Sequence, residues 1–217
     1  ALNAPIQNLF DYSFENNSEI TPKPGQRVRV PFGKQEKVGF ISKVSDTTKV
    51  ASSKIRPIIN ILDKNPILDS ELLKLIDWTS RYYYHPIGEV FAAAVPLYLR
   101  QSKYPKLTDQ DSTSETLVLQ TRKKLTKEQN QSFEDISDAV IKKEPIVLNG
   151  ITGSGKTELY MQVIERQLKT KEQALVLVPE IGLTPQLLGE FRCRFGNTIA
   201  VIHSENTPKE NAVNWVK

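Results

Sequence analysis

Eight residues, GITGSGKT from Gly150 to Thr157, constrain the fold of this chain more than any other stretch. They match the pattern G-x-x-x-x-G-K-[ST], in which a glycine-rich turn between a strand and a helix points backbone N–H groups at phosphate oxygens. A match arises by chance in about one chain in a hundred of this length. An apolar run precedes it at 145–148, and a helical pattern follows it at 158–168. The sequence therefore predicts a nucleotide-binding loop rather than a flexible glycine loop without a ligand.

Two side chains of this loop are the candidate catalytic residues. Lys156 is expected to reach the β- and γ-phosphates as a mobile positive charge, and Thr157 is expected to offer its hydroxyl to Mg²⁺. The residues of the loop that we expect to bind nucleotide are Gly150, Thr152, Gly153, Ser154, Gly155, Lys156 and Thr157.

The residues around the loop predict an α/β fold. A helical pattern from 125 to 140 and an apolar strand at 145–148 precede the loop, and further strand patterns lie at 173–178 and 198–202. Strands that alternate with helices form a parallel sheet that the helices cover.

Efficient hydrolysis of a nucleotide also needs an acidic residue that holds the metal. Glu180 follows the strand at 173–178, but it stands behind Pro179 and suits a surface turn better. No D-E-x-[HD] sequence follows. The chain is therefore expected to bind phosphate without the machinery for cleavage.

The N-terminal part predicts a small β-rich, barrel-like domain with helices. Residues 26–44 alternate polar and apolar side chains around PFGKQEK, which is typical of a hairpin, and 55–62 is strand-like. Residues 70–84 show helical spacing, with Asp69 or Ser70 as the N-cap. Residues 101–124 are polar and resemble a linker. We expect a first domain at 1–104, a linker at 105–124 and a nucleotide-binding domain at 125–217.

Charge and composition narrow the class of partner. Residues 1–104 carry 14 Lys and Arg against 10 Asp and Glu, whereas 105–217 carry 15 of each. The first part is the better candidate to bind a polyanion, although a solvated basic surface that binds nothing would have the same composition.

A single cysteine, Cys193, excludes an internal disulfide. The first residues lack signal-peptide features and no apolar run reaches membrane-spanning length, so we expect a cytoplasmic protein without membrane contact.

Six segments together resemble the PriA family of bacterial primosomal replication-restart helicases, which belongs to helicase superfamily 2. Three of them resemble the family's first, RecA-like helicase lobe: LNGITGSGKTELYMQVI (148–164), ALVLVPEIGLTPQLL (174–188) and VIHSENTPKENAVNW (201–215). The other three resemble its N-terminal domain, which caps the 3′ end of a DNA strand at a stalled fork: FDYSF (10–14), GQRVRVPFGKQEKVGFI (25–41) and YYYHPIGEVFAAAVPLYLR (82–100).

This resemblance implies which residues bind DNA in the first domain. Asp11 and aromatic neighbours would hold the terminal nucleotide, the carboxylate by hydrogen bonding and the rings by stacking. Packing of an edge strand is the alternative for the aromatic residues, and a turn or cap is the alternative for Asp11. The family often has lysine where this chain has arginine at position 56. The implied residues are Phe10, Asp11, Tyr12, Gly33, Lys34 and Arg56.

The resemblance also assigns residues outside the phosphate loop. Gln129 matches the family's glutamine, whose amide recognises the adenine base by hydrogen bonds. A solvent-facing helix residue is the alternative for Gln129. A second set would contact the DNA strand, although a buried, hydrogen-bonded histidine is an alternative for His203. Where the family continues with glycine after Ser204, this chain has Glu205. The implied DNA-contacting residues are Glu180, Gly182, Thr184, His203 and Ser204.

The function that the resemblance implies is that of an ATP-dependent 3′-to-5′ DNA helicase that recognises stalled or branched forks and initiates primosome assembly. ATP and Mg²⁺ are the implied cofactors; the family also binds zinc, for which this chain has no ligand cluster. Implied partners are fork DNA with a 3′ end, single-stranded DNA, primosome proteins and the single-stranded DNA-binding protein, in the bacterial cytoplasm at the nucleoid.

The family carries a winged-helix domain between the two halves, and a linker of about 20 residues is too short for any domain. Either that domain has been lost, or the residues form a contiguous numbering of an incompletely observed chain. Two other classes stay open: a small-molecule P-loop kinase with a β-rich regulatory domain, and a non-catalytic DNA-end adaptor. The VPEIGLTPQ run disfavours the first, and the intact GITGSGKT disfavours the second.

Overall fold

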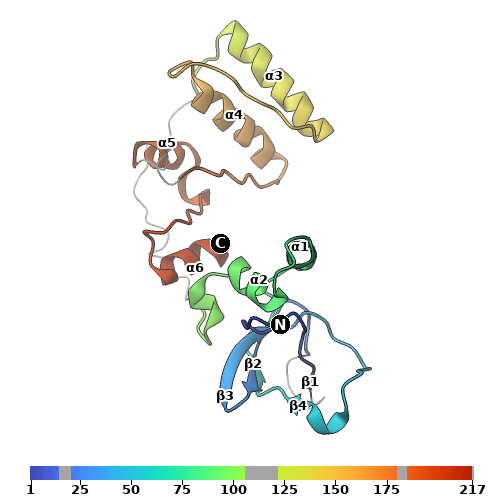
Figure 1. Ribbon diagram of the computed structural model, residues 1–217. Coiled ribbons are helices and arrows are strands. Elements are labelled where there is room, and N and C mark those ends of the chain that lie inside the picture. The colour runs from blue at the N-terminus through green and yellow to red at the C-terminus, as the bar shows by residue number, and fades with distance from the viewer. Residues whose placement is uncertain (15–20, 106–121, 180–184, 217) are drawn as a thin grey trace. The chain divides into compact units, whose positions relative to one another are not determined.

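A computed structural model describes residues 1–14, 21–105, 122–179 and 185–216 of the chain (Figure 1). The chain divides into two compact units. Unit 1 comprises Ala1–Thr108 together with Ala200–Lys217, and unit 2 comprises Asp109–Ile199. Each unit is described by itself.

Unit 1 is built on a hairpin of strands β2 (Arg27–Phe32) and β3 (Gln35–Phe40). The strands pair antiparallel in full, from Arg27 opposite Phe40 to Phe32 opposite Gln35. Gly33 begins the two-residue turn between them at φ +61°, a conformation that glycine adopts without steric cost. The alternating pattern therefore predicted the hairpin correctly, but the turn is tighter than the expected loop PFGKQEK.

Three shorter strands complete the sheets of unit 1: β1 (Tyr12–Ser13), β4 (Arg56–Pro57) and β5 (Asn60–Ile61). Strand β5 joins the hairpin in the order β3-β2-β5, whereas β1 pairs with β4 in a separate parallel sheet. Among the described residues the strands thus form two small sheets rather than one closed barrel.

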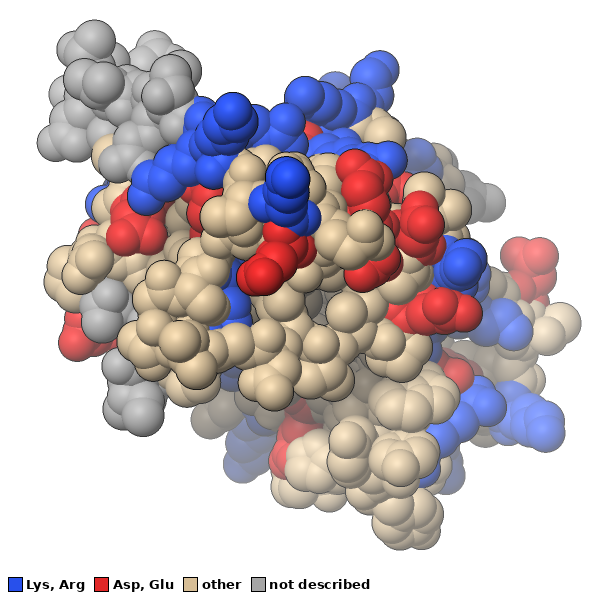
Figure 2. All heavy atoms as spheres, turned by 90° about the horizontal axis from the view of Figure 1, so that it is seen from above, with Lys and Arg blue, Asp and Glu red and all other residues tan. Residues whose placement is uncertain are grey.

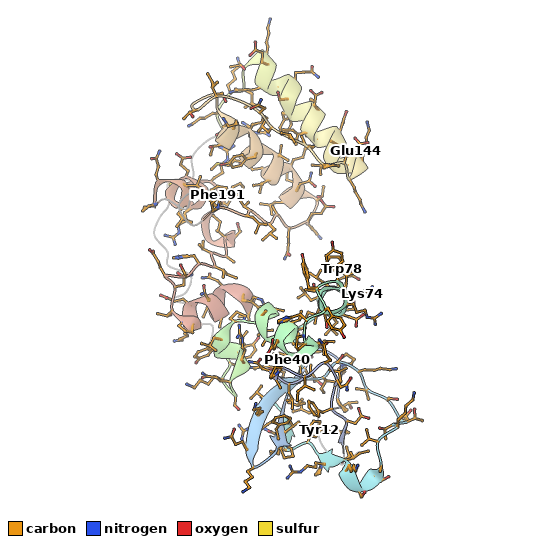
Figure 3. All side chains as sticks on the ribbon, viewed as in Figure 1. Tyr12, Phe40, Lys74, Trp78, Glu144 and Phe191 are labelled. Carbon is orange, nitrogen blue, oxygen red and sulfur yellow. The ribbon has the colours of Figure 1, made fainter. Side chains whose placement is uncertain are left out.

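Helices follow the strands in unit 1 and pack against one another and against Phe40 at the end of β3. Helix α1 (Ser70–Tyr82) begins where the Asp69 carboxylate accepts a hydrogen bond from the Leu72 N–H at 2.8 Å, the predicted N-cap. Helix α2 (Ile87–Ala94) packs beside α1 and is followed by the 3₁₀ turn η2 (Leu97–Arg100). A further 3₁₀ turn, η1 (Ser52–Lys54), precedes β4. Phe40 stacks on Phe91 at 5.5 Å between the sheet and α2 (Figure 3). The buried core around this pair comprises Phe40, Leu68, Ile76, Val90, Phe91, Val95 and Leu99.

A buried ion pair fixes the end of the first domain. The Arg27 side chain is 1% exposed, and its Nη2 lies 2.6 Å from Oδ1 of Asp63. Its Nη1 donates to the backbone carbonyls of Leu99 (2.7 Å), Gln101 (3.2 Å) and Lys103 (2.7 Å). Because all these acceptors converge on one guanidinium, Arg27 sets the direction in which the chain leaves this core.

The C-terminal helix α6 (Pro208–Val216) packs in unit 1 rather than with the phosphate loop. Ala212 of α6 is fully buried in the core described above, and Trp215 packs against it. The sequence analysis placed these residues in the nucleotide-binding domain at 125–217, a boundary that stays a prediction.

Unit 2 consists of helices joined by irregular segments. They are α3 (Lys127–Lys142), α4 (Lys156–Lys169), α5 (Pro185–Phe195) and the 3₁₀ turn η5 (Gly196–Thr198). Thr126 and Gln129 form a reciprocal capping box at the start of α3. The predicted helices at 125–140 and 158–168 are thus confirmed, each with its boundaries shifted slightly.

The strands predicted at 145–148, 173–178 and 198–202 do not form ladders: no strand occurs in the described residues after Ile61. Val147 is 92% exposed and Leu175 is 85% exposed. A strand of a parallel sheet is stable when neighbouring strands and helices cover both its faces, and these apolar side chains have no such cover here. The chain is thus a mixed α/β protein, as predicted, and the described residues of unit 2 contain no strand of the predicted parallel sheet.

Across the described ranges, none of the helices has the length and apolar character that crossing a bilayer requires. Figure 2 looks from the side of α3 and α4 and shows Lys and Arg side chains interspersed with Asp and Glu, in keeping with the balanced charge of residues 105–217.

Candidate functional sites

Unit 1 brings four of the residues predicted to bind a DNA end into one cluster. Tyr12 pairs with Arg56 in the sheet of β1 and β4, and its hydroxyl donates to the Pro31 carbonyl at 3.0 Å. Arg56 Nη1 donates to the carbonyl of Gly33 at 3.1 Å, which ties this sheet to the hairpin turn. Phe10 meets Phe32 edge to face at 5.3 Å. Residues far apart in sequence thus present two kinds of group, aromatic rings and a guanidinium, at one place.

Asp11 lies on the surface beside this cluster. Its Oδ2 accepts a hydrogen bond from the hydroxyl of Thr48, which in turn accepts from the Val50 N–H at 3.0 Å. The side chain is therefore accessible to a ligand, although one of its oxygens is engaged. Thr48 was not predicted, because nothing in the local sequence indicates a contact with a residue 37 positions away.

The sequence analysis did not predict two further residues of this cluster, Phe32 and Lys37. Phe32 supplies a second ring, and the ammonium of Lys37 lies 4.8 Å from the centre of that ring, within cation–π distance. Lys34 stands exposed at the hairpin turn. Burial raises the pKa of the Tyr12 hydroxyl, an effect that the positive charge of Arg56 partly offsets. The cluster thus combines stacking surfaces with three cations, the pattern of sites that bind single nucleic acid strands.

The phosphate loop of unit 2 has its predicted helix but not its predicted strand. Helix α4 begins at Lys156, directly after Gly155, which serves as N-cap at φ +84°. Gly153 also has a positive φ of +81°. The residues before the loop are irregular. The N-terminal N–H groups and the positive end of the dipole of α4 are therefore in place for an anion.

Lys156 and Gln129 are both engaged by the loop itself. The Lys156 ammonium donates to the carbonyls of Gly150 and, at 2.8 Å, of Ile151. Gln129 donates to the Ser154 carbonyl at 2.9 Å and accepts from the Thr126 N–H at 2.9 Å. Both halves of the Gln129 amide thus have partners within the chain, so reading an adenine edge would require Gln129 to exchange one of them.

A cavity of about 570 Å³ lies over the loop. Its walls comprise five parts of the chain: the segment before α3, the start of α3, the phosphate loop, the first turns of α4, and α5. The charged residues in the lining are Lys123, Lys124, Lys156, Glu158, Glu190 and Arg194. Thr157, the predicted Mg²⁺ ligand, lies in the same lining. Within the described ranges, no group of three or more His, Cys, Asp or Glu residues could hold a metal by itself.

Of the five remaining residues predicted to contact DNA, the structure describes two, His203 and Ser204. Glu180, Gly182 and Thr184 lie outside the described residues. His203 and Ser204 belong to unit 1, where the His203 carbonyl accepts from Asn211 Nδ2 at 3.1 Å. Asn211 belongs to α6, which thus holds this turn in place.

Unit 1 also exposes an aromatic cluster that the sequence reading did not single out. Trp78 and Tyr82 stack at 4.8 Å along α1, and Tyr83 meets Tyr82 edge to face at 4.9 Å. Trp78 is half exposed on the outer side of α1 (Figure 3), and Tyr84 is 83% exposed. The helical spacing of Trp78 and Tyr82 was visible in the sequence, but their exposure was not. Exposed aromatic surfaces of this kind are typical of protein interfaces.

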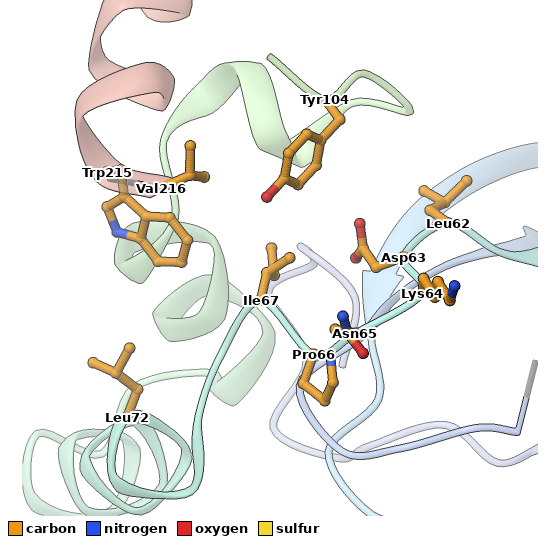
Figure 4. Close-up of a pocket in the computed structure, with 10 residues that line it drawn as sticks. All are labelled: Leu62, Asp63, Lys64, Asn65, Pro66, Ile67, Leu72, Tyr104, Trp215 and Val216. Carbon is orange, nitrogen blue, oxygen red and sulfur yellow. The ribbon is translucent and has the colours of Figure 1, made fainter. Parts of the chain in front are cut away.

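Unit 1 also contains a cavity, of about 630 Å³, between α6 and residues 62–67 (Figure 4). Figure 4 shows the hydroxyl of Tyr104 and the indole of Trp215 at its walls. Asp63, which also lines it, already holds Arg27.

Comparison with protein families assigns a class to each half of the chain. Residues 1–96 match the model of the PriA 3′ DNA-binding domain (3′BD). Residues 122–214 match the model of the res subunit of type III restriction enzymes, a helicase-like region. The chain thus joins a region that matches the PriA 3′ DNA-binding domain to a helicase-like region that contains the phosphate loop.

Several proteins with similar sequences are replication restart proteins of the PriA family. The replication restart protein PriA of Haemophilus influenzae is 27% identical over 286 residues, which cover 99% of this chain and 39% of that protein. PriA of Rickettsia conorii is 30% identical over 195 residues, which cover 88% of this chain and 28% of that protein. PriA of Bacillus subtilis is 47% identical over 95 residues. The predicted resemblance to the PriA family is therefore confirmed, and it concerns the N-terminal portion of these proteins.

Proposed function

We propose that this chain is the DNA-end-binding and phosphate-binding part of an ATP-dependent 3′-to-5′ DNA helicase that restarts replication at stalled or branched forks. The observation that carries the proposal is the combination, in one chain, of a PriA-type 3′ DNA-binding domain with a G-x-x-x-x-G-K-[ST] loop at the start of a helix. Fork DNA, single-stranded DNA, primosome proteins and the single-stranded DNA-binding protein are its proposed partners, in the bacterial cytoplasm.

The cluster of unit 1 supports the first half of this proposal. A terminal nucleotide needs a surface on which its base stacks and groups that hold its sugar and phosphate. Phe10 and Phe32 supply rings, Arg56 and Lys37 supply positive charge, and Asp11 supplies an accessible carboxylate. A carboxylate accepts a hydrogen bond from a free 3′ hydroxyl, a group that is absent where the strand continues.

The loop of unit 2 supports the second half. The N–H groups at the start of α4 bind phosphate, Lys156 neutralises the β- and γ-phosphates, and Thr157 holds Mg²⁺. When nucleotide binds, the Lys156 ammonium exchanges the carbonyls of Gly150 and Ile151 for phosphate oxygens. Because this exchange costs two hydrogen bonds, the chain by itself is expected to bind nucleotide weakly. It is expected to hydrolyse almost none, because no D-E-x-[HD] sequence that would hold the metal follows the loop.

The PriA relatives are longer than this chain, which matches only part of their length. The chain spans 28–39% of the two PriA proteins that it matches over most of its length. The Haemophilus alignment runs over 286 residues, more than the 217 of this chain, so that protein carries additional residues inside the aligned region. These residues support the proposal that the family's winged-helix domain is missing between the two halves. A RecA-like parallel sheet in the helicase-like region belongs to the same proposal.

Fluorescence anisotropy with labelled fork DNA tests the DNA-end function. We expect the chain to bind a fork with a free 3′ end more tightly than one whose 3′ end is blocked by a terminal phosphate. Asp11→Asn should weaken binding to the free end and leave binding to the blocked end unchanged. Asp46→Asn is a matched control, because it removes an exposed carboxylate from the same surface region. Equal losses on both forks would refute the role of Asp11.

The same titrations in the presence of Mg-ATP separate the competing classes. A non-catalytic end adaptor would bind DNA but no nucleotide, and a small-molecule kinase would bind nucleotide with no preference for a DNA end. The slope of affinity against salt concentration counts the phosphates that the site neutralises. Turnover of ATP by this chain at about 1 per second or faster would contradict the expected lack of hydrolysis.

A further inference from the structure

Arg194 of α5 is a buried cation at the edge of the nucleotide cavity. Its side chain is 3% exposed, although the residue contributes to the cavity lining. Nη2 lies 3.0 Å from Oε1 of Glu158, and Nε donates to Oε1 of Glu165. Both carboxylates belong to α4, the helix that the phosphate loop opens.

We propose that Arg194 is a positioning residue for nucleotide: it neutralises and holds the Glu158 carboxylate, which would otherwise repel the phosphates at the start of α4. The inference rests on the proposed nucleotide site and adds to it a residue from a different helix.

The position of Glu158 is the first step of the argument. Glu158 follows Lys156 by two residues, lies in the first turn of α4 and lines the cavity. A carboxylate at a helix N-terminus is stabilised by the same N–H groups and dipole that attract phosphate. Glu158 is therefore a built-in competitor of the ligand, unless its charge is compensated.

The contacts of Glu158 show how it is compensated. Its Oε1 accepts from Arg194, from Gln162 Nε2 at 2.7 Å and from the Lys123 N–H at 3.3 Å. Arg194 is the charged partner among these three. The hydrogen bonds hold the carboxylate on the face of α4 that meets α5, which keeps the carboxylate from turning toward the phosphates.

The charges of the network balance with Arg194 present. Glu165 also pairs with Arg122, whose Nε lies 3.6 Å from Oε2. Two guanidinium groups thus face the two carboxylates of Glu158 and Glu165. Loss of Arg194 leaves one negative charge in excess beside a cavity that must accept a polyanion, and at such short range in a partly buried site this repulsion is strong.

Four variants in a fluorescent nucleotide titration test the proposal. Arg194→Gln should weaken the affinity for Mg-ATP about tenfold, the effect of one uncompensated charge at short range. Glu158→Gln should tighten the affinity severalfold, because it removes the competing charge. The double variant Arg194→Gln/Glu158→Gln should bind within about threefold of Glu158→Gln, since Arg194 acts through that carboxylate. Arg192→Gln is the matched control, an exposed arginine of the same helix, and should bind as the parent chain does.

Several outcomes decide between the possible explanations. The loss in Arg194→Gln should shrink as salt is raised, because its origin is electrostatic. Should Arg194→Gln lose its helical circular dichroism, the tightening by Glu158→Gln still tests the proposal, because structural damage does not tighten binding. A double variant as weak as Arg194→Gln, or an unchanged affinity in Glu158→Gln, would overturn the role of Arg194. Absence of binding by the parent chain would refute the nucleotide site itself, and with it this inference.

Discussion

Replacement of Asp63 by asparagine is expected to cost more stability than almost any other change of similar size in unit 1. Asp63 Oδ1 and Oδ2 accept three side-chain hydrogen bonds from the guanidinium of Arg27, at 2.6–3.2 Å. Oδ2 also accepts from the backbone N–H of Arg27 at 2.8 Å. Asparagine keeps the shape, but it removes the countercharge and turns an N–H₂ group toward the donors of Arg27.

The magnitude follows from burial. The Arg27 and Asp63 side chains are 1% and 4% exposed, so water does not replace the lost charge. Breaking a buried pair by removal of one partner costs about 3–5 kcal/mol, because the other charge stays buried without compensation. For a domain of this size that is a drop in Tm of roughly 12 °C or more. Much of the folding stability of a small domain would be lost, since the total is about 5–15 kcal/mol.

Urea unfolding followed by tryptophan fluorescence measures this loss. The two tryptophans, Trp78 and Trp215, both lie in unit 1, so the signal reports on that unit. Asp77→Asn is the control, because it breaks the exposed pair with Arg81 and should cost less than about 1 kcal/mol. If Asp63→Asn and Asp77→Asn shift the transition by the same amount, the reasoning from burial is wrong.

Three further predictions concern single residues. Lys156→Ala should abolish measurable nucleotide binding in calorimetry, because the phosphates lose their main countercharge; unchanged affinity would exclude the assignment of the loop. Gly155→Ala should weaken nucleotide binding in the same assay, since φ is +84° and the added methyl would stand 2.5 Å from Gln129 Nε2; an affinity equal to that of the parent chain would show that this conformation is not needed. Hydrogen bonds from the Thr207 hydroxyl and N–H lower the pKa of Glu210 below its ordinary value of 4.5, so their contribution to α6 is present above that value and is lost as pH falls through the lowered pKa. In an NMR pH titration, Thr207→Val should move the Glu210 pKa back toward 4.5, and an unshifted midpoint would contradict this cause.

Local features of the sequence determined the elements that depend on near neighbours. The alternating pattern at 26–44 predicted the β2–β3 hairpin, and Asp69 predicted the start of α1. The glycines of GITGSGKT predicted the turn that opens α4, and Gly153 and Gly155 adopt positive φ there. Such features are determined within a few residues, because caps, turns and helix periodicity involve short separations along the chain.

The strands predicted in the helicase-like region do not appear among the described residues, and the reason is physical. An apolar run of four to six residues indicates a strand that could be buried, but it does not supply the partners that would bury it. The residues at 145–148 and 173–178 have no ladder here, and their apolar side chains are exposed. A single helix such as α4, by contrast, satisfies its own backbone hydrogen bonds and forms without such partners.

Sequence alone therefore determined the phosphate loop, the hairpin, the principal helices and the family to which the motifs point. The tertiary structure decided which distant residues meet: Tyr12 with Arg56, Arg27 with Asp63 and the Leu99 carbonyl of η2, and Arg194 with Glu158. It also decided that α6 packs in the first core. Contacts between charges that lie 29 or more positions apart depend on which faces the packed elements bury, and no local pattern encodes that choice.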